Sequence, residues 1–330
     1  MAVFSGPDLT PSVYAAPGAR AVSVVDLDGD GHLDLVAAGG GVSVLDGSNY
    51  FNGAYYQGTF GTGVATVDID GDGLLDVVSG NFNGVSVYRN LGDGVLAAPQ
   101  ALPIGGGYLT VGDFDGDGHP DFASGVEPIL TILLNRGGVI EKSQQFLPHA
   151  GPWRMATADV NEDGVLDLVT TDYSVGFSGS SGDTFSVLLG HGDGTFADPI
   201  SHFAGDAPWE LAVADVDGDH HVDVIIEQLR NLLVFKGAGD ATFTLARMTQ
   251  LPQQELAPLG VGPCTATDCQ LFIAGSKLWS LQLADPTSVP VERAAGTSLN
   301  APWQLLVTDV DGDAAPDVVV ANAATSSTIP

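Results

Sequence analysis

The chain contains the nine-residue stretch Asp26-Leu27-Asp28-Gly29-Asp30-Gly31-His32-Leu33-Asp34. Counted from Asp26, acids stand at positions 1, 3, 5 and 9, and a glycine stands at position 6. Four side-chain oxygens within nine residues suit a hard cation, which takes about six to eight oxygen ligands, and the glycine permits the positive φ that turns the acids inward. The stretch therefore predicts a loop that binds Ca²⁺.

The same spacing returns five more times, so we expect up to six Ca²⁺ ions in structural roles. The predicted side-chain ligands are, in loop order, Asp26, Asp28, Asp30 and Asp34; Asp68, Asp70, Asp72 and Asp76; Asp113, Asp115, Asp117 and Asp121; Asp159, Asn161, Asp163 and Asp167; Asp215, Asp217, Asp219 and Asp223; and Asp309, Asp311, Asp313 and Asp317. The backbone carbonyl of position 7 is expected to complete each set, at His32, Leu74, His119, Val165, His221 and Ala315.

One such cluster alone would be a turn, because Asp and Gly favour turns. Six clusters in register, each followed by an apolar run, favour metal loops instead. An EF-hand is excluded because it needs a bidentate acid at position 12, where the first loop has Ala37, and flanking helices that the sequence does not predict.

The chain is strongly acidic: its 330 residues include 41 Asp plus Glu against 10 Lys plus Arg, a formal net charge of −31. Five loops with four acids each and one with three hold 23 of these acids, and six Ca²⁺ ions would bring the charge to −19. Phosphate recognition rests on clustered Lys and Arg, so neither nucleic acid nor an anionic membrane is an expected partner. Loops of this kind commonly work at the calcium concentrations found outside cells, which predicts an extracellular, periplasmic or cell-surface location.

Two further features bear on targeting. No apolar stretch approaches the ~18 residues of a membrane span, so membrane insertion is not expected. Residues 1–8 lack the basic start and apolar segment of a signal peptide, so we expect a mature chain or a segment excised from a larger surface protein.

The spacing of the loops reveals a seventh, hidden repeat. The first acids stand at 26, 68, 113, 159, 215 and 309, and the last interval of 94 is twice 47. Residues 259–269 align with the start of the fifth loop, but Pro263, Thr265, Thr267 and Leu271 replace the acids. This repeat is expected to bind no metal, and we predict that a Cys264–Cys269 disulfide closes its loop instead.

Each repeat predicts four short strands. Apolar and β-branched residues alternate with period two before and after the loop, and no helical periodicity occurs in about 45 residues per repeat. The prediction is an all-β, seven-bladed β-propeller that forms one domain over residues 1–330, with blades starting near residues 20, 62, 107, 153, 209, 257 and 303. The ring is expected to close by pairing of the N- and C-terminal strands. Residues 1–19 are expected to give the outermost strand of the last blade, which Val3–Pro7 would form, and the third strand is expected to begin at Ser327–Pro330. Most of that third strand is missing, so we expect the last blade to be incomplete or rearranged.

These residues resemble the FG-GAP/VCBS repeat family, the β-propeller type of integrin α-subunits. The segments Val213-Ala214-Asp215-Val216-Asp217-Gly218-Asp219 and Gly190-His191-Gly192-Asp193-Gly194-Thr195-Phe196 are similar to the VCBS form, although the Phe-Gly-…-Gly-Ala-Pro string of integrins is not found. The resemblance implies that each Asp-rich loop joins the first and second strands of a blade on one face and binds calcium. Departures are Asn161 at position 3 and His220 and Ala314 at position 6, where a side chain at positive φ costs about 1 kcal/mol.

A ligand site is expected on the opposite face. Three loops that enter first strands carry Pro-Trp, six residues before the first acid, and a polar residue follows each Trp; the candidates are Trp153 with Arg154, Trp209 with Glu210 and Trp303 with Gln304. An indole beside hydrogen-bonding groups suits a sugar ring or a peptide anchor. An enlarged loop, residues 173–183, is expected on this face too. The competing interpretation is that a repeated Trp packs neighbouring blades together.

Several function classes remain open. The resemblance implies adhesion, glycan binding as in certain fungal lectins, or an accessory or catalytic role in polysaccharide degradation. No common catalytic motif is present, so the evidence for an enzyme is weaker. Of the 18 acids outside the loops, four could face the ligand side and supply a carboxyl pair, namely Glu127, Asp172, Glu210 and Glu227. We predict a calcium-stabilised, lectin-like module that binds a glycan or an extracellular protein. A catalytic or accessory propeller of a polysaccharide lyase or hydrolase, or a purely structural segment, is the alternative.

Overall fold

A computed structural model gives the fold. It describes residues 1–5, 9–14, 16, 18–48, 53–58, 60–103, 106–126, 128–147, 152–173, 182–228, 230–252, 257–265, 267–293, 299 and 301–322. Over these residues the chain forms 28 β-strands, and a search of the same residues finds no helix long and apolar enough to cross a membrane.

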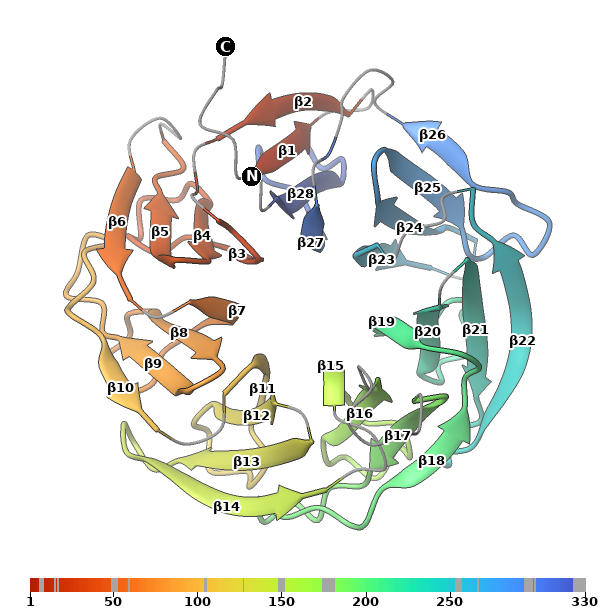
Figure 1. Ribbon diagram of the computed structural model, residues 1–330, viewed down its shortest axis with the longest axis horizontal. Coiled ribbons are helices and arrows are strands. Elements are labelled where there is room, and N and C mark those ends of the chain that lie inside the picture. Colours follow the sequence, from red (N-terminus) through yellow and green to blue (C-terminus); the bar gives the residue numbers. More distant parts are fainter. Residues whose placement is uncertain are drawn as a thin grey trace.

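The strands form seven antiparallel sheets of four strands, arranged as blades around a central axis (Figure 1). Blades one to three contain β3 (Ala21–Val25), β4 (Asp34–Ala38), β5 (Gly41–Leu45) and β6 (Gly53–Gln57); β7 (Gly61–Val67), β8 (Asp76–Asn81), β9 (Gly84–Tyr88) and β10 (Gln100–Leu102); and β11 (Tyr108–Gly112), β12 (Asp121–Val126), β13 (Ile129–Asn135) and β14 (Ile140–Phe146). The predicted seven-bladed propeller is confirmed.

Blades four to six follow in the same way. They contain β15 (Pro152–Ala158), β16 (Asp167–Asp172), β17 (Thr184–Leu188) and β18 (Ile200–Phe203); β19 (Pro208–Ala214), β20 (Asp223–Gln228), β21 (Asn231–Gly237) and β22 (Phe243–Gln250); and β23 (Leu259–Cys264), β24 (Cys269–Ala274), β25 (Leu278–Gln282) and β26 (Val291–Arg293). In every blade the first strand lies next to the axis and the fourth lies at the rim (Figure 1).

The seventh blade closes the ring with strands from both ends of the chain. Its order is β27 (Pro302–Thr308), β28 (Asp317–Asn322), β1 (Ala2–Ser5) and β2 (Thr10–Val13). Val3 pairs with Val319 on one side and with Ser12 on the other. Closure by pairing of the two ends is therefore confirmed.

One detail of the predicted closure is wrong. Val3–Pro7 was assigned to the fourth strand, but β1 takes the third position and β2 the fourth. The physical reason is burial: Ala2, Val3 and Phe4 are at most 2% exposed, as in a strand covered on both faces, whereas the rim strand β18 is largely exposed. Ser327–Pro330, assigned to the third strand, lies outside the described residues, and β1 already holds that place.

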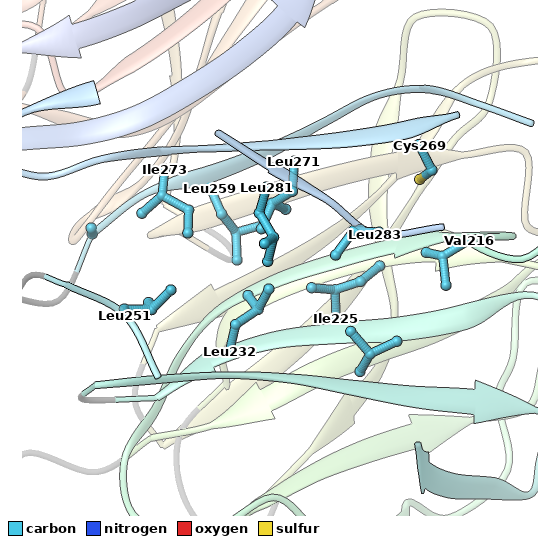
Figure 2. Close-up of a cluster of buried hydrophobic side chains, with 12 residues drawn as sticks. Val216, Ile225, Leu232, Leu251, Leu259, Cys269, Leu271, Ile273, Leu281 and Leu283 are labelled. Atoms are coloured by element: carbon cyan, nitrogen blue, oxygen red, sulfur yellow. The ribbon is translucent and has the colours of Figure 1, made fainter. Parts of the chain in front are cut away.

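Hydrophobic clusters join the blades. The described residues form seven such clusters, and each one spans two neighbouring blades. Figure 2 shows the cluster between blades five and six, where Ile225 and Leu232 of one blade face Leu271 and Ile273 of the other. The sixth blade, which lacks the acidic loop, thus packs like the rest, because its β-branched and leucine side chains keep the same alternation.

Candidate functional site

The acidic loops all lie on one face of the ring. Each joins the first and second strands of its blade, and its position-9 aspartate opens the second strand, as Asp34 opens β4 and Asp121 opens β12. First strands run in the same sense in every blade, so the six loops emerge on the same side. We call this side the acidic-loop face.

Hydrogen bonds within each loop hold the carboxylates in place. In the first loop, Asp26 at position 1 accepts from the amides of Gly29 at 2.8 Å and Gly31 at 3.0 Å, and Asp30 accepts from the amide of His32 at 2.8 Å. The bond from the position-7 amide to the position-5 carboxylate recurs in all six loops, at 2.8–2.9 Å. Hydrogen bonds from the loop's own backbone amides thus fix the positions of these carboxylates.

Two positions of each loop need a positive φ. Position 6 has the predicted conformation, with φ of 90° at Gly31, 74° at His220 and 65° at Ala314, so the last two carry the strain expected of a side chain there. Position 4 also has a positive φ, for example 79° at Gly29 and 60° at Glu162. The glycine that usually stands at position 4 could have indicated this second turn.

The position-9 aspartates are buried and act as anchors. Asp121 is 0% exposed, and its two oxygens accept from the amides of Phe114 at 2.9 Å and Asn135 at 2.8 Å. Burial, reinforced by the nearby carboxylates of Asp115 and Asp117, raises the pKa of Asp121 to about 6. A divalent cation would relieve both the desolvation and the repulsion.

The acidic clusters can hold a metal ion. In four loops the oxygens of positions 1, 3 and 9 lie within 4.8 Å of one another, namely Asp26, Asp28 and Asp34; Asp68, Asp70 and Asp76; Asp113, Asp115 and Asp121; and Asp215, Asp217 and Asp223. Calcium–oxygen bonds of about 2.3–2.6 Å allow two ligands on opposite sides of an ion to stand about 5 Å apart. Carboxylate oxygens at these separations therefore fit one shared Ca²⁺.

Basic side chains reach into three of the loops. Arg89 Nη1 lies 2.7 Å from Asp76 Oδ2 and 3.2 Å from Asp70 Oδ2 in the second loop. Equivalent ion pairs join Arg136 to Asp115 and Asp117 in the third loop, and Lys236 to Asp217 in the fifth. In the first blade Asp46 follows the third strand, where the second blade has Arg89, and Asp46 groups with Asp28 and Asp30. The loops therefore differ in charge although their spacing is the same.

The first four acidic loops are also hydrogen-bonded to the next blade. The position-2 carbonyls of Leu27 and Ile69 accept from the side-chain amides of Asn90 and Asn135, both at 2.9 Å. The equivalent carbonyls of the third and fourth loops, at Phe114 and Val160, accept from the backbone amides of Gly194 at 2.9 Å and Ala241 at 3.1 Å. An ordered loop therefore stabilises the contact between two blades.

The loop of the sixth blade, which has no acidic cluster, is held by a disulfide and by hydrogen bonds. Cys264 and Cys269 form a disulfide, as predicted. Gln282 accepts from the backbone amide of Cys269 at 2.8 Å and donates to Asp268 at 2.7 Å. A covalent bond and one amide side chain thus take the place of the acidic cluster.

The three predicted tryptophans lie on the opposite face, which we call the tryptophan face. Each stands at the start of a first strand, and all three are partly buried. The rings of Trp153 and Trp209 are 4.6 Å apart between centroids, and Tyr173 packs edge-on against both, at 5.4 and 5.3 Å. Tyr108 of the third blade lies 5.0 Å from Trp153. Trp153 therefore packs against residues of both neighbouring blades and is still partly exposed, so it combines the features of the packing and the ligand-binding interpretations.

The polar partners of the tryptophans join across the axis. Arg154 Nε donates to Glu210 at 2.7 Å, and Arg154 Nη2 donates to the carbonyl of Trp303 at 2.8 Å. Burial lowers the pKa of Arg154, but Glu210 and Tyr108 outweigh it, so the pKa is raised and the guanidinium stays charged. Gln304 accepts from the backbone amide of Val22 at 2.7 Å. The residues that the sequence placed in three separate loops therefore form one network.

One residue of this face was missed by the sequence analysis. The guanidinium of Arg20, just before β3, lies over the ring of Trp303 at 4.1 Å and over the ring of Phe60 at 4.3 Å. No motif marks Arg20, because blade one has no Pro-Trp; its place before a first strand was the one available signal.

The candidate acids outside the loops are enclosed. Glu210 and Glu227 stand opposite each other on β19 and β20, and Glu227 is 0% exposed. Burial, and then the nearby Glu210, raises the pKa of Glu227 to about 9, so Glu227 is a neutral acid at pH 7. Asp172 is also buried and accepts from Thr184 at 2.8 Å and Ser186 at 2.6 Å. Glu127 and residues 174–181 lie outside the described residues.

Comparison with known proteins supports the assignment of the repeats. Residues 68–124 and 113–170 match the FG-GAP-like repeat, so the predicted resemblance is confirmed, and the chain is a seven-bladed β-propeller that carries FG-GAP-like repeats. Among curated proteins, no sequence matches the chain.

Solved structures share the fold. A lectin from Agrocybe aegerita, described as recognising non-reducing terminal N-acetylglucosamine, is 17% identical with a TM-score of 0.59 over 88% of this chain and 89% of the lectin. BBS1N in complex with ARL6DN is 15% identical, with a TM-score of 0.64 over 94% and 90%. A protein of unknown function from Desulfotomaculum acetoxidans is 12% identical, with a TM-score of 0.63 over 97% and 95%. At these identities the likeness concerns the fold.

Proposed function

We propose that the protein is a calcium-stabilised binding module that recognises a glycan through its tryptophan face and works outside the cell, in the periplasm or at the cell surface. The observation that carries the proposal is the partly open aromatic surface of Trp153, Trp209 and Tyr173, next to the Arg154–Glu210 pair. Aromatic rings beside fixed polar groups suit the C–H face and the hydroxyls of a sugar ring.

Calcium has a structural role in this proposal. Positions 1, 3, 5, 7 and 9 of the six acidic loops would hold the ions, and each ion would neutralise its loop. The first four of these loops are hydrogen-bonded to the next blade. The disulfide in the loop of the sixth blade and the expected need for millimolar calcium agree with an oxidising, calcium-rich compartment. The lectin-like fold neighbour adds support, as does the propeller that binds a protein partner, which makes an extracellular protein the competing ligand.

A glycan array tests the proposal. Calcium-loaded protein should bind a defined set of sugars, and a variant with Trp153, Trp209 and Trp303 changed to Ala should lose that signal while its melting curve in calcium remains cooperative. Phe203→Ala is the matched control, because Phe203 is 72% exposed on the rim strand β18, away from the axis. A blank array with folded protein would move the search to protein ligands.

A further inference from the structure

A cavity of about 300 Å³ lies on the axis of the ring. Its lining comes from all seven blades: the first strands β7, β11, β15, β19, β23 and β27, and Arg20 just before β3. The polar residues of the lining are Arg20, Thr62, Tyr108, Arg154, Glu210 and Gln304. The volume is at the lower end of the ~300–1,000 Å³ typical of ligand pockets, so it suits a ligand about the size of one sugar.

Arg20 is a cation without an acidic partner. Acids outnumber Lys and Arg by 41 to 10 in this chain, yet Arg20 forms no ion pair with any described residue. Its guanidinium is held between the rings of Phe60 and Trp303, and its Nε is buried and has no hydrogen-bond partner. A guanidinium fixed in this way presents its planar fork to a ligand.

The neighbouring arginine is satisfied, which isolates Arg20 further. Arg154 is neutralised by Glu210 and donates to the carbonyl of Trp303, whose ring supports Arg20. The Arg154–Glu210 pair thus positions Arg20 through Trp303. Two arginines and one glutamate leave one uncompensated positive charge in the cavity, inside a protein of net charge −31.

The other open groups of the cavity are donors. Thr62 is 4% exposed, and its hydroxyl has no hydrogen-bond partner, which is unfavourable for a buried polar group. Gln304 uses its amide oxygen for the backbone amide of Val22, so its NH₂ group is what remains for a ligand. A guanidinium, a hydroxyl and an amide NH₂ around one cavity call for an acceptor with several oxygens.

We propose that the axial cavity binds a carboxylate, and that the glycan of the tryptophan face is therefore an acidic sugar, with its carboxylate paired to Arg20. Arginine and carboxylate match as a bidentate pair, and the burial of Arg20 Nε strengthens that pair. The inference rests on the proposed glycan-binding function, since it names the class of glycan.

The test compares sugars that differ only at the acid group. Calorimetric titration of the calcium-loaded full chain with glucuronic acid and glucose, and with galacturonic acid and galactose, should give at least tenfold tighter binding of the acid in one pair. Arg20→Gln should abolish this preference. Lys142→Gln, which removes one charge from the rim strand β14, should leave it unchanged.

A second variant keeps the test meaningful if Arg20→Gln does not fold. Thr62→Val removes the unpartnered hydroxyl without changing the size of the side chain; it should weaken acid binding severalfold while the melting temperature stays equal or rises. Equal affinity for acid and neutral sugars, or an acid preference that survives Arg20→Gln, would overturn the inference.

Other outcomes separate the inference from the function on which it rests. Binding of neutral sugars that depends on the tryptophans but not on Arg20 would leave the proposed function standing and remove the acidic-sugar assignment. Binding of polyglutamate but of no sugar would support a carboxylate site in the cavity, and would overturn both the acidic-sugar assignment and the proposed glycan-binding function.

Discussion

The two faces of the ring are built on different principles. On the acidic-loop face, the same local hydrogen bonds recur in six blades, such as the bond from the position-7 amide to the position-5 carboxylate. On the tryptophan face, equivalent positions carry different residues, and Arg154 of the fourth blade meets Glu210 of the fifth and Trp303 of the seventh. The repeated face stabilises the ring, whereas the varied face carries the ligand site that we propose.

Removing metal should have the largest effect and should act on the acidic-loop face. An ion bound only by the folded state contributes about 2.7 kcal/mol at a free concentration of 100 Kd, so several occupied loops together contribute many kcal/mol. We expect the melting temperature in excess chelator to fall well below that in millimolar calcium. An unchanged melting curve would contradict the calcium role of all six loops.

Glu227, on the tryptophan side of blade five, predicts an effect of pH that metal does not cause. Its pKa is raised from the ordinary 4.5 to about 9, so it binds a proton in the folded state where the unfolded chain has lost it. Its contribution to the free energy of unfolding is full below pH 4.5 and is lost as pH rises through 9. Glu227→Gln should raise the unfolding free energy at pH 7 by about 1–3 kcal/mol.

The measurement is denaturant unfolding in saturating calcium between pH 6.5 and 9.5. The wild type should lose stability across this range, and Glu227→Gln should lose less. Glu292→Gln is the matched control, because Glu292 lies on the rim strand β26 in a partly exposed ion pair with Lys277. Parallel curves for wild type and Glu227→Gln would show that Glu227 does not carry the effect.

The smallest expected effect concerns Arg89, which makes the second acidic loop differ in charge from the first. Because its guanidinium contacts Asp70 and Asp76, a cation entering the second loop has to displace it. Arg89→Gln should tighten calcium binding at one site by about tenfold, equivalent to ~1.4 kcal/mol, while Asp46→Asn should weaken one site in the first blade. Calorimetric titration with Ca²⁺ checks both, with Lys277→Gln as the control, because Lys277 lies between β24 and β25, at the opposite end of its blade from the acidic-loop face. No change with either variant would mean that these charges do not set affinity.

The sequence was most informative where the structure depends on local contacts. The spacing from Asp26 to Asp34 predicts the loop because the backbone amides that its carboxylates accept from lie within the loop itself or at the end of the third strand. The interval of 94 likewise indicated the sixth blade, since a ring needs a blade of ordinary length there.

Contacts between residues far apart in the sequence could not be predicted in this way. The sequence marked Arg154 and Glu210 as equivalent neighbours of two tryptophans, but 56 residues separate them and no spacing rule pairs them. No sequence motif marks Arg20, and its partners are aromatic rings from blades two and seven, which no spacing rule connects to it. The third-strand place of β1 was missed for the same reason: its partner β28 lies at the other end of the chain.

The pairing of β1 with β28 has a consequence for how the protein is made. The strands β1 and β2 are synthesised before the other strands of the ring, but β28 begins only at Asp317. At about 5–20 residues per second, β1 waits roughly 15–60 s for its partner, while Val3 and Phe4 have no cover and one edge of the hairpin has no ladder. The apolar strand β1 therefore stays uncovered on one edge until the rest of the ring has been made, and we expect it to join the ring last.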